Sequence, residues 1–302
     1  MKRRVILMGG KTYVLSLPAR WIKKYQIQKG EELDVEEQDN AIVVRTEKVP
    51  AGKETEVDFS DLERMFDRGM SALYKAGCNR VKITYRNRDQ LRRIEAALQK
   101  MHLGFGITRQ GEGYVVIESF TDVKADEFPN ALRRFFYSLE VMNQDLARAL
   151  TTHDAEALRG IIARDEENNK IADMCRRIIN SGVTQSLSAP HLLFYTIEQL
   201  ERIGDSYKMI AVTALSSKKH VSKDIVPLLG DIQDLFVQCR VLFYDFDFKI
   251  IEEFGKKRDD VKAKLEKVYS QSQPESFPIL FHLRHMAETI YDLNGVLLTR
   301  GV

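Results

Sequence analysis

The amino-acid sequence predicts a multidomain α+β protein, on three observations. Its 302 residues are more than one ordinary domain of about 100–200 residues contains. With 44% hydrophobic and 30% charged residues, the chain can bury substantial cores and stay soluble, which excludes wholesale disorder. The pattern also changes along the chain, from short strands to long amphipathic stretches with no convincing strand beyond residue 125. We therefore expect a small β domain, a small α/β sandwich and a C-terminal all-α region, in that order.

The first domain, residues 1–48, is called the head. Alternating apolar residues and turn signals predict the order strand, strand, helix, strand, strand, over residues 5–8, 13–17, 19–25, 33–36 and 42–45. Pro18 suits the first helical position, and the helix must stop before Gly30. Because a core this small is marginal alone, we expect the head to dimerise.

The net charge of +2 hides an uneven distribution along the chain. Residues 1–30 hold eight basic residues and no acidic one, whereas the other 272 residues hold 38 basic and 44 acidic residues. Clusters of Lys and Arg attract phosphate groups, so the head is expected to meet a phosphate-bearing partner. The alternative is a dimerisation unit with an ordinary basic surface, and it is the weaker one because solvated surfaces usually mix both signs.

The head also resembles the AbrB/SpoVT/MazE swapped-hairpin family. The resemblance rests on Gly10-Lys11, Ser16-Leu17-Pro18, Trp21, Ile27 and Lys29-Gly30-Glu31, followed by acidic–apolar alternation and a final strand. It implies an intertwined homodimer that binds double-stranded DNA through basic residues near the first hairpin and the short helix. In this sequence those residues are Arg3, Arg4, Lys11, Arg20, Lys23 and Lys24.

Residues 53–122 predict a small α/β domain with helices on one face of a sheet. We expect helices over 59–76 and 89–101, and strands over 80–85, 104–109 and 114–119. Ser60 is the expected N-cap of the first helix, ahead of Asp61 and Glu63 in its first turn. The sequence indicates no functional site in this domain.

Residues 125–302 predict six helices that divide into two similar units. The expected helices cover residues 127–152, 155–180, 189–216, 224–251, 256–270 and 277–299, with Gly or Pro near their ends. Four residues of the third helix recur 87 residues later in the sixth: Leu193, Phe194, Glu201 and Asp205 correspond to Leu280, Phe281, Glu288 and Asp292. A pair of three-helix bundles, at about 125–217 and 223–302, explains this repeat.

The repeated acidic residues form carboxylate stripes on the predicted helices. Glu201/Asp205 and Glu288/Asp292 share the spacing E-x-x-x-D, which puts both members of a pair on one helical face. Glu198 extends the first stripe, and the second helix carries another stripe of Asp165, Asn169 and Asp173. Like charges at this spacing repel, and a cation that prefers oxygen ligands would offset the repulsion. A solvated acidic face is the alternative, but recurrence in both units favours a metal.

The all-α region resembles PhoU, a phosphate-signalling protein built from two three-helix bundles. The resemblance rests on the stretch Leu200–Asp205 and on the repeated E-x-x-x-D spacing. It implies metal ions on the bundle surface, with Glu201, Asp205, Glu288, Asp292, Asp165 and Glu198 as the expected ligands. Iron or manganese is the expected metal, and magnesium or calcium is the alternative. It also implies a phosphate transporter or signalling protein as a partner.

Cysteine usage and hydropathy predict a cytoplasmic protein. Cys78, Cys175 and Cys239 are far apart and odd in number, so they form no disulfide framework. The apolar run Val5–Met8 is too short for a signal peptide, and no run is long enough to span a bilayer, so no membrane insertion is expected.

Together these observations predict a cytoplasmic, homodimeric, DNA-binding regulator of phosphate uptake, and not an enzyme. No nucleophile, general base or His-rich site accompanies the carboxylates, which argues against a metal-dependent enzyme. A phosphate-signalling adaptor that does not bind DNA, and whose head only dimerises, stays open as an alternative. A MazE-like antitoxin is a further rival; a proteolysis-prone tail that binds a toxin would favour it, and packed helix is expected there instead.

Overall fold

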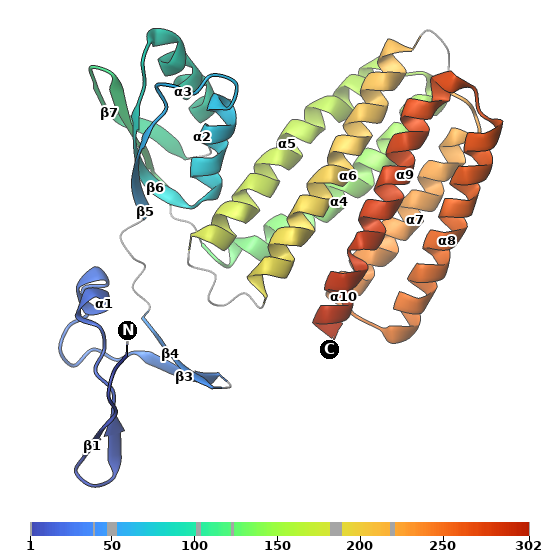
Figure 1. The fold of residues 1–302 in the computed structure, drawn as a ribbon. Helices are drawn as coiled ribbons and strands as arrows, with labels where there is room; N and C mark the ends of the chain where they lie inside the picture. The colour runs from blue at the N-terminus through green and yellow to red at the C-terminus, as the bar shows by residue number, and fades with distance from the viewer. Residues whose placement is uncertain are drawn as a thin grey trace.

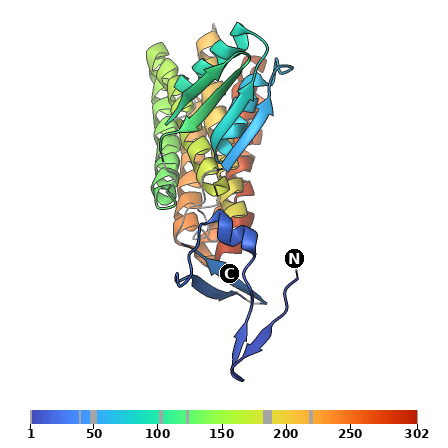
Figure 2. The same cartoon turned by 90° about the vertical axis from the view of Figure 1, so that its left-hand side faces the viewer.

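The computed structural model describes residues 2–38, 40–46, 53–100, 104–121, 124–181, 189–217 and 221–301. There the chain forms a head of β-hairpins, an α/β domain with a four-stranded sheet, and a long helical bundle (Figure 1). The predicted α+β class, with small β-hairpins at the N-terminus and a helical C-terminal region, is therefore confirmed. The α/β domain lies beside the bundle in Figure 1 and in front of it in Figure 2. The predicted domain boundaries at 48 and 122 lie outside the described residues.

The described part of the head consists of two hairpins joined through one short helix. β1 (Ile6–Met8) pairs antiparallel with β2 (Thr12–Val14), and β3 (Asp34–Gln38) pairs antiparallel with β4 (Ala41–Arg45). α1 (Ala19–Lys24) lies between the hairpins in the sequence. The predicted order of elements is confirmed. Two details differ: the second strand ends at Val14 because its pairing ends at Ile6↔Val14, and Pro18 is the N-cap of α1 rather than its first helical residue.

The α/β domain contains the sheet order β5-β6-β8-β7, in which β5 and β6 run parallel and the other pairs antiparallel. Its elements are β5 (Lys53–Asp58), α2 (Phe66–Lys75), β6 (Cys78–Thr84), α3 (Arg88–Lys100), β7 (Phe105–Gly111) and β8 (Tyr114–Ser119). Phe66 and Met70 of α2 and Ile94 of α3 pack with Ile83 and Val115 of the sheet to form the core of this domain. The predicted end of the second helix at Met101 lies outside the described residues.

Two predictions for the α/β domain are wrong. The sequence analysis missed β5, because an edge strand tolerates charge: Glu54 and Glu56 on β5 form ion pairs with Arg80 and Lys82 on β6. The first helix begins at Phe66, not at residue 59, and Ser60 is not its N-cap. Ser60 lies in a turn instead, where its backbone N–H donates to the Asp58 carboxylate at 2.9 Å.

The bundle consists of two helix trios and a short terminal helix. Its helices are α4 (Glu127–Thr152), α5 (Ala155–Asn180), α6 (Pro190–Ser216), α7 (Ile225–Tyr244), α8 (Phe248–Gln271), α9 (Phe277–Asp292) and α10 (Asn294–Gly301), with the 3-10 helix η2 (Pro274–Ser276) before α9. Helices α4, α5 and α6 contact one another, and so do α7, α8 and α9. Contacts of α4 with α7 and of α6 with α9 join the trios, and the Phe136 ring packs between Phe236 and Phe243. No described helix is long and apolar enough to cross a membrane.

The second trio differs from the prediction at two helix ends. The break between the fourth and fifth helices falls at Asp245–Asp247 rather than at residues 252–255, because Asp247 is a strong N-cap that accepts from the N–H groups of Lys249 and Ile250. Asp154 caps α5 in the same way. These matching caps put Asp154 and Asp247, 93 residues apart, in equivalent positions of the two trios. The sixth predicted helix is interrupted at Leu293, so it forms α9 and α10.

Candidate nucleic-acid interface and carboxylate network

The six predicted DNA-binding residues are exposed in the head. Arg3 and Arg4 precede β1, Lys11 lies in the β1–β2 turn, and α1 carries Arg20, Lys23 and Lys24. Lys23 and Lys24 occupy the last turn of α1, where the helix dipole favours positive charge. None of the six forms an ion pair with a residue that the structure describes, so all six are available to an anionic partner.

One chain does not bring these six residues into a single patch. In both views, α1 and the tip of the β1–β2 hairpin lie at opposite ends of the head (Figures 1 and 2). Gly9 and Gly10 both have positive φ, which the tight turn at this tip requires. The hairpin therefore projects Lys11 away from Arg20, Lys23 and Lys24.

The apolar residues of the head strands are exposed to solvent rather than packed in a core. No described residue of the head is buried. The exposed fraction is 59% for Ile6, 75% for Tyr13, 66% for Val35 and 69% for Ile42. Val35 and Ile42 share one face of their hairpin, since Ile42 pairs with Glu37, two residues after Val35. Isolated two-stranded hairpins are only marginally stable in water, so we expect the apolar face with Val35 and Ile42 to be covered by another surface.

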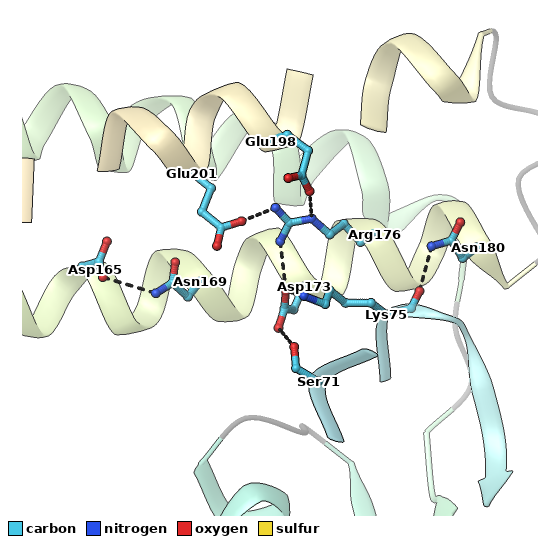
Figure 3. A network of polar contacts seen from close by, with 9 residues as sticks. All are labelled: Ser71, Lys75, Asp165, Asn169, Asp173, Arg176, Asn180, Glu198 and Glu201. Atoms are coloured by element: carbon cyan, nitrogen blue, oxygen red, sulfur yellow. Dashed lines mark hydrogen bonds and ion pairs between the residues drawn. The ribbon is translucent and has the colours of Figure 1, made fainter. Parts of the chain in front are cut away.

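Carboxylates of α5 and α6 converge on the guanidinium of Arg176 (Figure 3). Arg176 donates to Asp173 at 2.9 Å, to Glu198 at 2.6 Å and to Glu201. The Arg176 side chain is only 3% exposed, whereas those of Glu198 and Glu201 are partly open to water at 43% and 31%. Burial raises the pKa of Glu201, and the charge and hydrogen bond of Arg176 oppose this rise.

Lys208 binds the other two predicted metal ligands of the first trio, Asp165 and Asp205. Its Nζ donates to Asp165 Oδ2 at 2.7 Å and to Asp205 Oδ1 at 2.6 Å. Asn169 Nδ2 donates to the same Asp165 oxygen at 3.2 Å. Glu201 and Asp205 therefore bind different cations, and their E-x-x-x-D spacing does not make them one site.

The corresponding residues of the second trio are less enclosed. Arg258 of α8 donates to Glu288 of α9 at 2.7 Å and to Asp259 at 2.9 Å. Asp292 is exposed and forms no ion pair with a described residue. The His285 ring is exposed and lies parallel to that of Phe281.

As placed, these side chains do not fit a metal ion. Among the described residues, no three His, Cys, Asp or Glu side chains are grouped to hold one. Arg176, Lys208 and Arg258 supply the positive charge that the sequence analysis assigned to iron or manganese. Sequence reasoning missed these cations although a signal existed, since Arg176 follows Asp173 and Lys208 follows Asp205 at the spacing i, i+3. Metal binding stays a prediction.

The carboxylate network continues into the α/β domain through α5. Asp173 also accepts from Ser71 Oγ at 3.1 Å, and Lys75 Nζ lies 3.8 Å from its other oxygen (Figure 3). Asn180 Nδ2 donates to the carbonyl of Lys75 at 2.9 Å. The charged stripe on α5 therefore lies at the interface between the bundle and the α/β domain. Asp173 takes part both in the carboxylate network and in this interface.

Arg177, the neighbour of Arg176, fixes the same interface from its buried side. Its guanidinium donates to the carbonyls of Tyr74 at 3.1 Å and Cys78 at 2.8 Å, and to Asn79 Oδ1 at 3.2 Å. Burial lowers the pKa of Arg177. Gly77, with positive φ, lies so close to Ser181 that an added Cβ would be 2.8 Å from its Cα. No local pattern in the sequence predicts this contact, because it depends on which face of α5 meets α2.

Two hairpins on either side of a short basic helix, with their apolar strands uncovered, define the head as a small β domain. Residues 6–52 match the model of the family described as antidote-toxin recognition MazE, bacterial antitoxin. This match confirms a MazE/AbrB-type head, which is consistent with DNA binding and dimerisation, and it ends before β5. No curated protein and no solved structure matches the chain.

Proposed function

We propose that the protein is a homodimeric DNA-binding regulator whose paired heads contact double-stranded DNA. One observation carries this proposal: the head combines uncovered apolar strands with exposed basic side chains that form no ion pair with any described acidic residue. Pairing with a second head would bury Val35 and Ile42, which the single chain leaves in water. DNA phosphates would then offset the positive charges of Arg20, Lys23 and Lys24.

Dimerisation also addresses the separation of the basic residues. Within one chain, the Lys11 turn and α1 lie at opposite ends of the head. A two-fold dimer carries two copies of each basic element, so either element can meet its symmetry mate along one duplex. The same symmetry predicts a DNA site that is an inverted repeat.

The test uses the full chain and DNA fragments selected from a genomic pool. We expect the combined variant Arg20→Ala, Lys23→Ala and Lys24→Ala to lower affinity at least about tenfold, since each copy loses three phosphate contacts. The matched control removes three exposed charges from the bundle, Arg159→Ala, Lys249→Ala and Lys267→Ala, and should bind as the wild type does. Equal affinity of the two triple variants would leave the head as a dimerisation unit and favour the adaptor function.

We further propose that the bundle reports phosphate status to the head, without enzymatic activity. The support is the repeat itself: two helix trios with equivalent Asp N-caps and a repeated E-x-x-x-D spacing, which resembles PhoU. The selected DNA should then lie upstream of phosphate-transport genes, and deletion of the regulator should change their transcripts when phosphate is limiting. Enrichment of unrelated DNA, with transcripts that ignore phosphate, would refute this part.

Toxin neutralisation is a second candidate function, favoured by the description of the family that residues 6–52 match. An antitoxin and a phosphate regulator differ in what their loss does to a cell. Deletion of an antitoxin gene arrests growth in rich medium unless a toxin gene is deleted as well. Normal growth after deletion, with altered phosphate uptake, would exclude the antitoxin.

A further inference from the structure

The second helix trio contains a cavity of about 620 Å³ between α8, η2 and α9. This volume lies within the range of about 300–1,000 Å³ that is usual for small-molecule sites. Its wall is mostly apolar and includes Leu265, Tyr269, Phe277, Leu280, Phe281 and Ala287. The rings of Tyr269 and Phe277 stack at 4.5 Å, which forms a flat aromatic surface on one side.

Two of these aromatic residues are exposed although they are large and apolar. The exposed fraction is 52% for Tyr269 and 64% for Phe281. Exposed aromatic side chains around a concave surface are typical of ligand-binding sites. The cavity can therefore take an apolar or aromatic body.

The charged residues of the cavity favour an anion. Arg258 and Glu288 neutralise each other at one end. Lys262 on α8 and Arg284 on α9 also line the cavity, and neither forms an ion pair with a residue that the structure describes. A second carboxylate, that of the exposed Glu266 on α8, also lines the cavity, so three cationic side chains face two carboxylates there. Lys262 and Arg284 are the two cations beside the apolar wall that form no ion pair with a described residue.

Comparison of the two trios shows why the second is open here. The offset of 93 residues that relates the caps Asp154 and Asp247 also relates Arg176 to Tyr269. In the first trio, the Arg176 guanidinium draws Glu198 and Glu201 together and fills this place. In the second trio the aromatic ring of Tyr269 stands at this position, and Glu288, the counterpart of Glu201, pairs with Arg258 instead.

We propose that this cavity binds a small organic acid with an apolar or aromatic body. The body would lie against Tyr269, Phe277 and Phe281, and the acid group would pair with Lys262 and Arg284. The lining contains both cationic and apolar side chains, so a ligand that matches it needs both an acid group and an apolar body. This site is independent of the DNA-binding head, so it can be tested whatever the head does.

The test measures binding to the full chain by isothermal titration calorimetry with three probes. 2-Naphthoate carries both features, 2-naphthamide has the same rings without the charge, and acetate has the charge without the rings. We expect 2-naphthoate to bind at least about tenfold more tightly than 2-naphthamide, and acetate to show no binding. Equal affinity for 2-naphthoate and 2-naphthamide, or no binding of 2-naphthoate at millimolar concentration, would overturn the proposal.

Variants place the site on the chain. The pair Lys262→Gln and Arg284→Gln should weaken 2-naphthoate binding about 10- to 100-fold and leave 2-naphthamide binding unchanged. Phe281→Ser should weaken the binding of both ligands. Because Phe281 is exposed, the variant should fold, and an unchanged melting temperature checks this. The control pair Arg159→Gln and Lys267→Gln should bind as the wild type does. If Phe281→Ser instead separates the dimer while 2-naphthoate binding persists, the face is an interface between copies, and the proposal is wrong.

Discussion

At the scale of single residues, two neighbouring arginines on α5 bind different parts of the molecule. Arg176 holds three carboxylates of the bundle, whereas Arg177 holds backbone carbonyls of the α/β domain. Both guanidinium groups are buried, so each relies on its partners to replace lost water. Removal of Arg177 takes a donor from the buried Cys78 carbonyl, whereas removal of Arg176 leaves three half-buried carboxylates without their shared cation.

Arg177→Met should lower the free energy of unfolding by about 2–4 kcal/mol, because the Cys78 carbonyl and Asn79 Oδ1 lose this donor and the Tyr74 carbonyl keeps only the N–H of Gly77. Arg159→Met, on the exposed face of the same helix, should change it by less than about 0.5 kcal/mol. Urea unfolding checks the energies, and hydrogen exchange at residues 74–79 shows whether the interface has loosened. Equal destabilisation by the two substitutions would contradict the role given to Arg177.

Arg176→Gln tests whether the Arg176 guanidinium occupies the position among the carboxylates at which a metal ion was expected. Without the guanidinium, Asp173, Glu198 and Glu201 repel one another, so the metal-free variant should melt below the wild type. Manganese(II) should then raise the melting temperature of the variant more than that of the wild type, since the freed carboxylates can bind it. Arg202→Gln, an exposed neighbour on α6, is the control. Equal rises in variant and wild type would show that Arg176 does not compete with metal.

At the scale of elements, the head hairpins are the least self-sufficient part of the chain. β1–β2 and β3–β4 are separate two-stranded sheets in the described residues, and their apolar faces are open. Charged substitutions on such a face cost little in a single chain but much in a buried interface. The strands therefore offer a direct test of dimerisation.

Val35→Asp with Ile42→Asp should convert a dimer into monomers of 34.8 kDa, measured by light scattering after size-exclusion chromatography. The bundle should keep its helical circular dichroism, because neither residue contributes to its core. Val212→Asp, at an exposed position on α6, should leave the dimer intact. A dimer that survives the head substitutions would place the interface elsewhere.

The elements that sequence could predict are those with a local signal. Apolar periodicity and end signals located the long helices, and an Asp N-cap marks both α5 and α8. β5 was missed because its charges are neutralised only by Arg80 and Lys82 on the next strand. The spacing of the carboxylates is visible in the sequence, but their pairing with Arg176 and Lys208 is not. Ion pairs between helices depend on the tertiary arrangement, which spacing within one helix does not contain.

At the scale of the whole molecule, the surface proposed for DNA and the cavity proposed for an organic acid lie on different parts of the chain. The head carries the exposed cations, and the α/β domain is fixed to α5 through Asp173 and Arg177. The cavity of the proposed organic acid belongs to the other trio, on α8 and α9. Each function can therefore be removed by substitution without disturbing the other two regions.

If the head binds DNA through its basic residues, the affinity of the full chain for DNA must depend steeply on salt concentration. The logarithm of the binding constant should fall linearly with the logarithm of salt concentration between about 50 and 200 mM, by about 0.9 for each phosphate contact. In a dimer, replacing Arg20, Lys23 and Lys24 by Ala removes six such contacts, so the slope should become shallower by up to about 5. A slope near zero, or one that the triple variant leaves unchanged, would contradict the account.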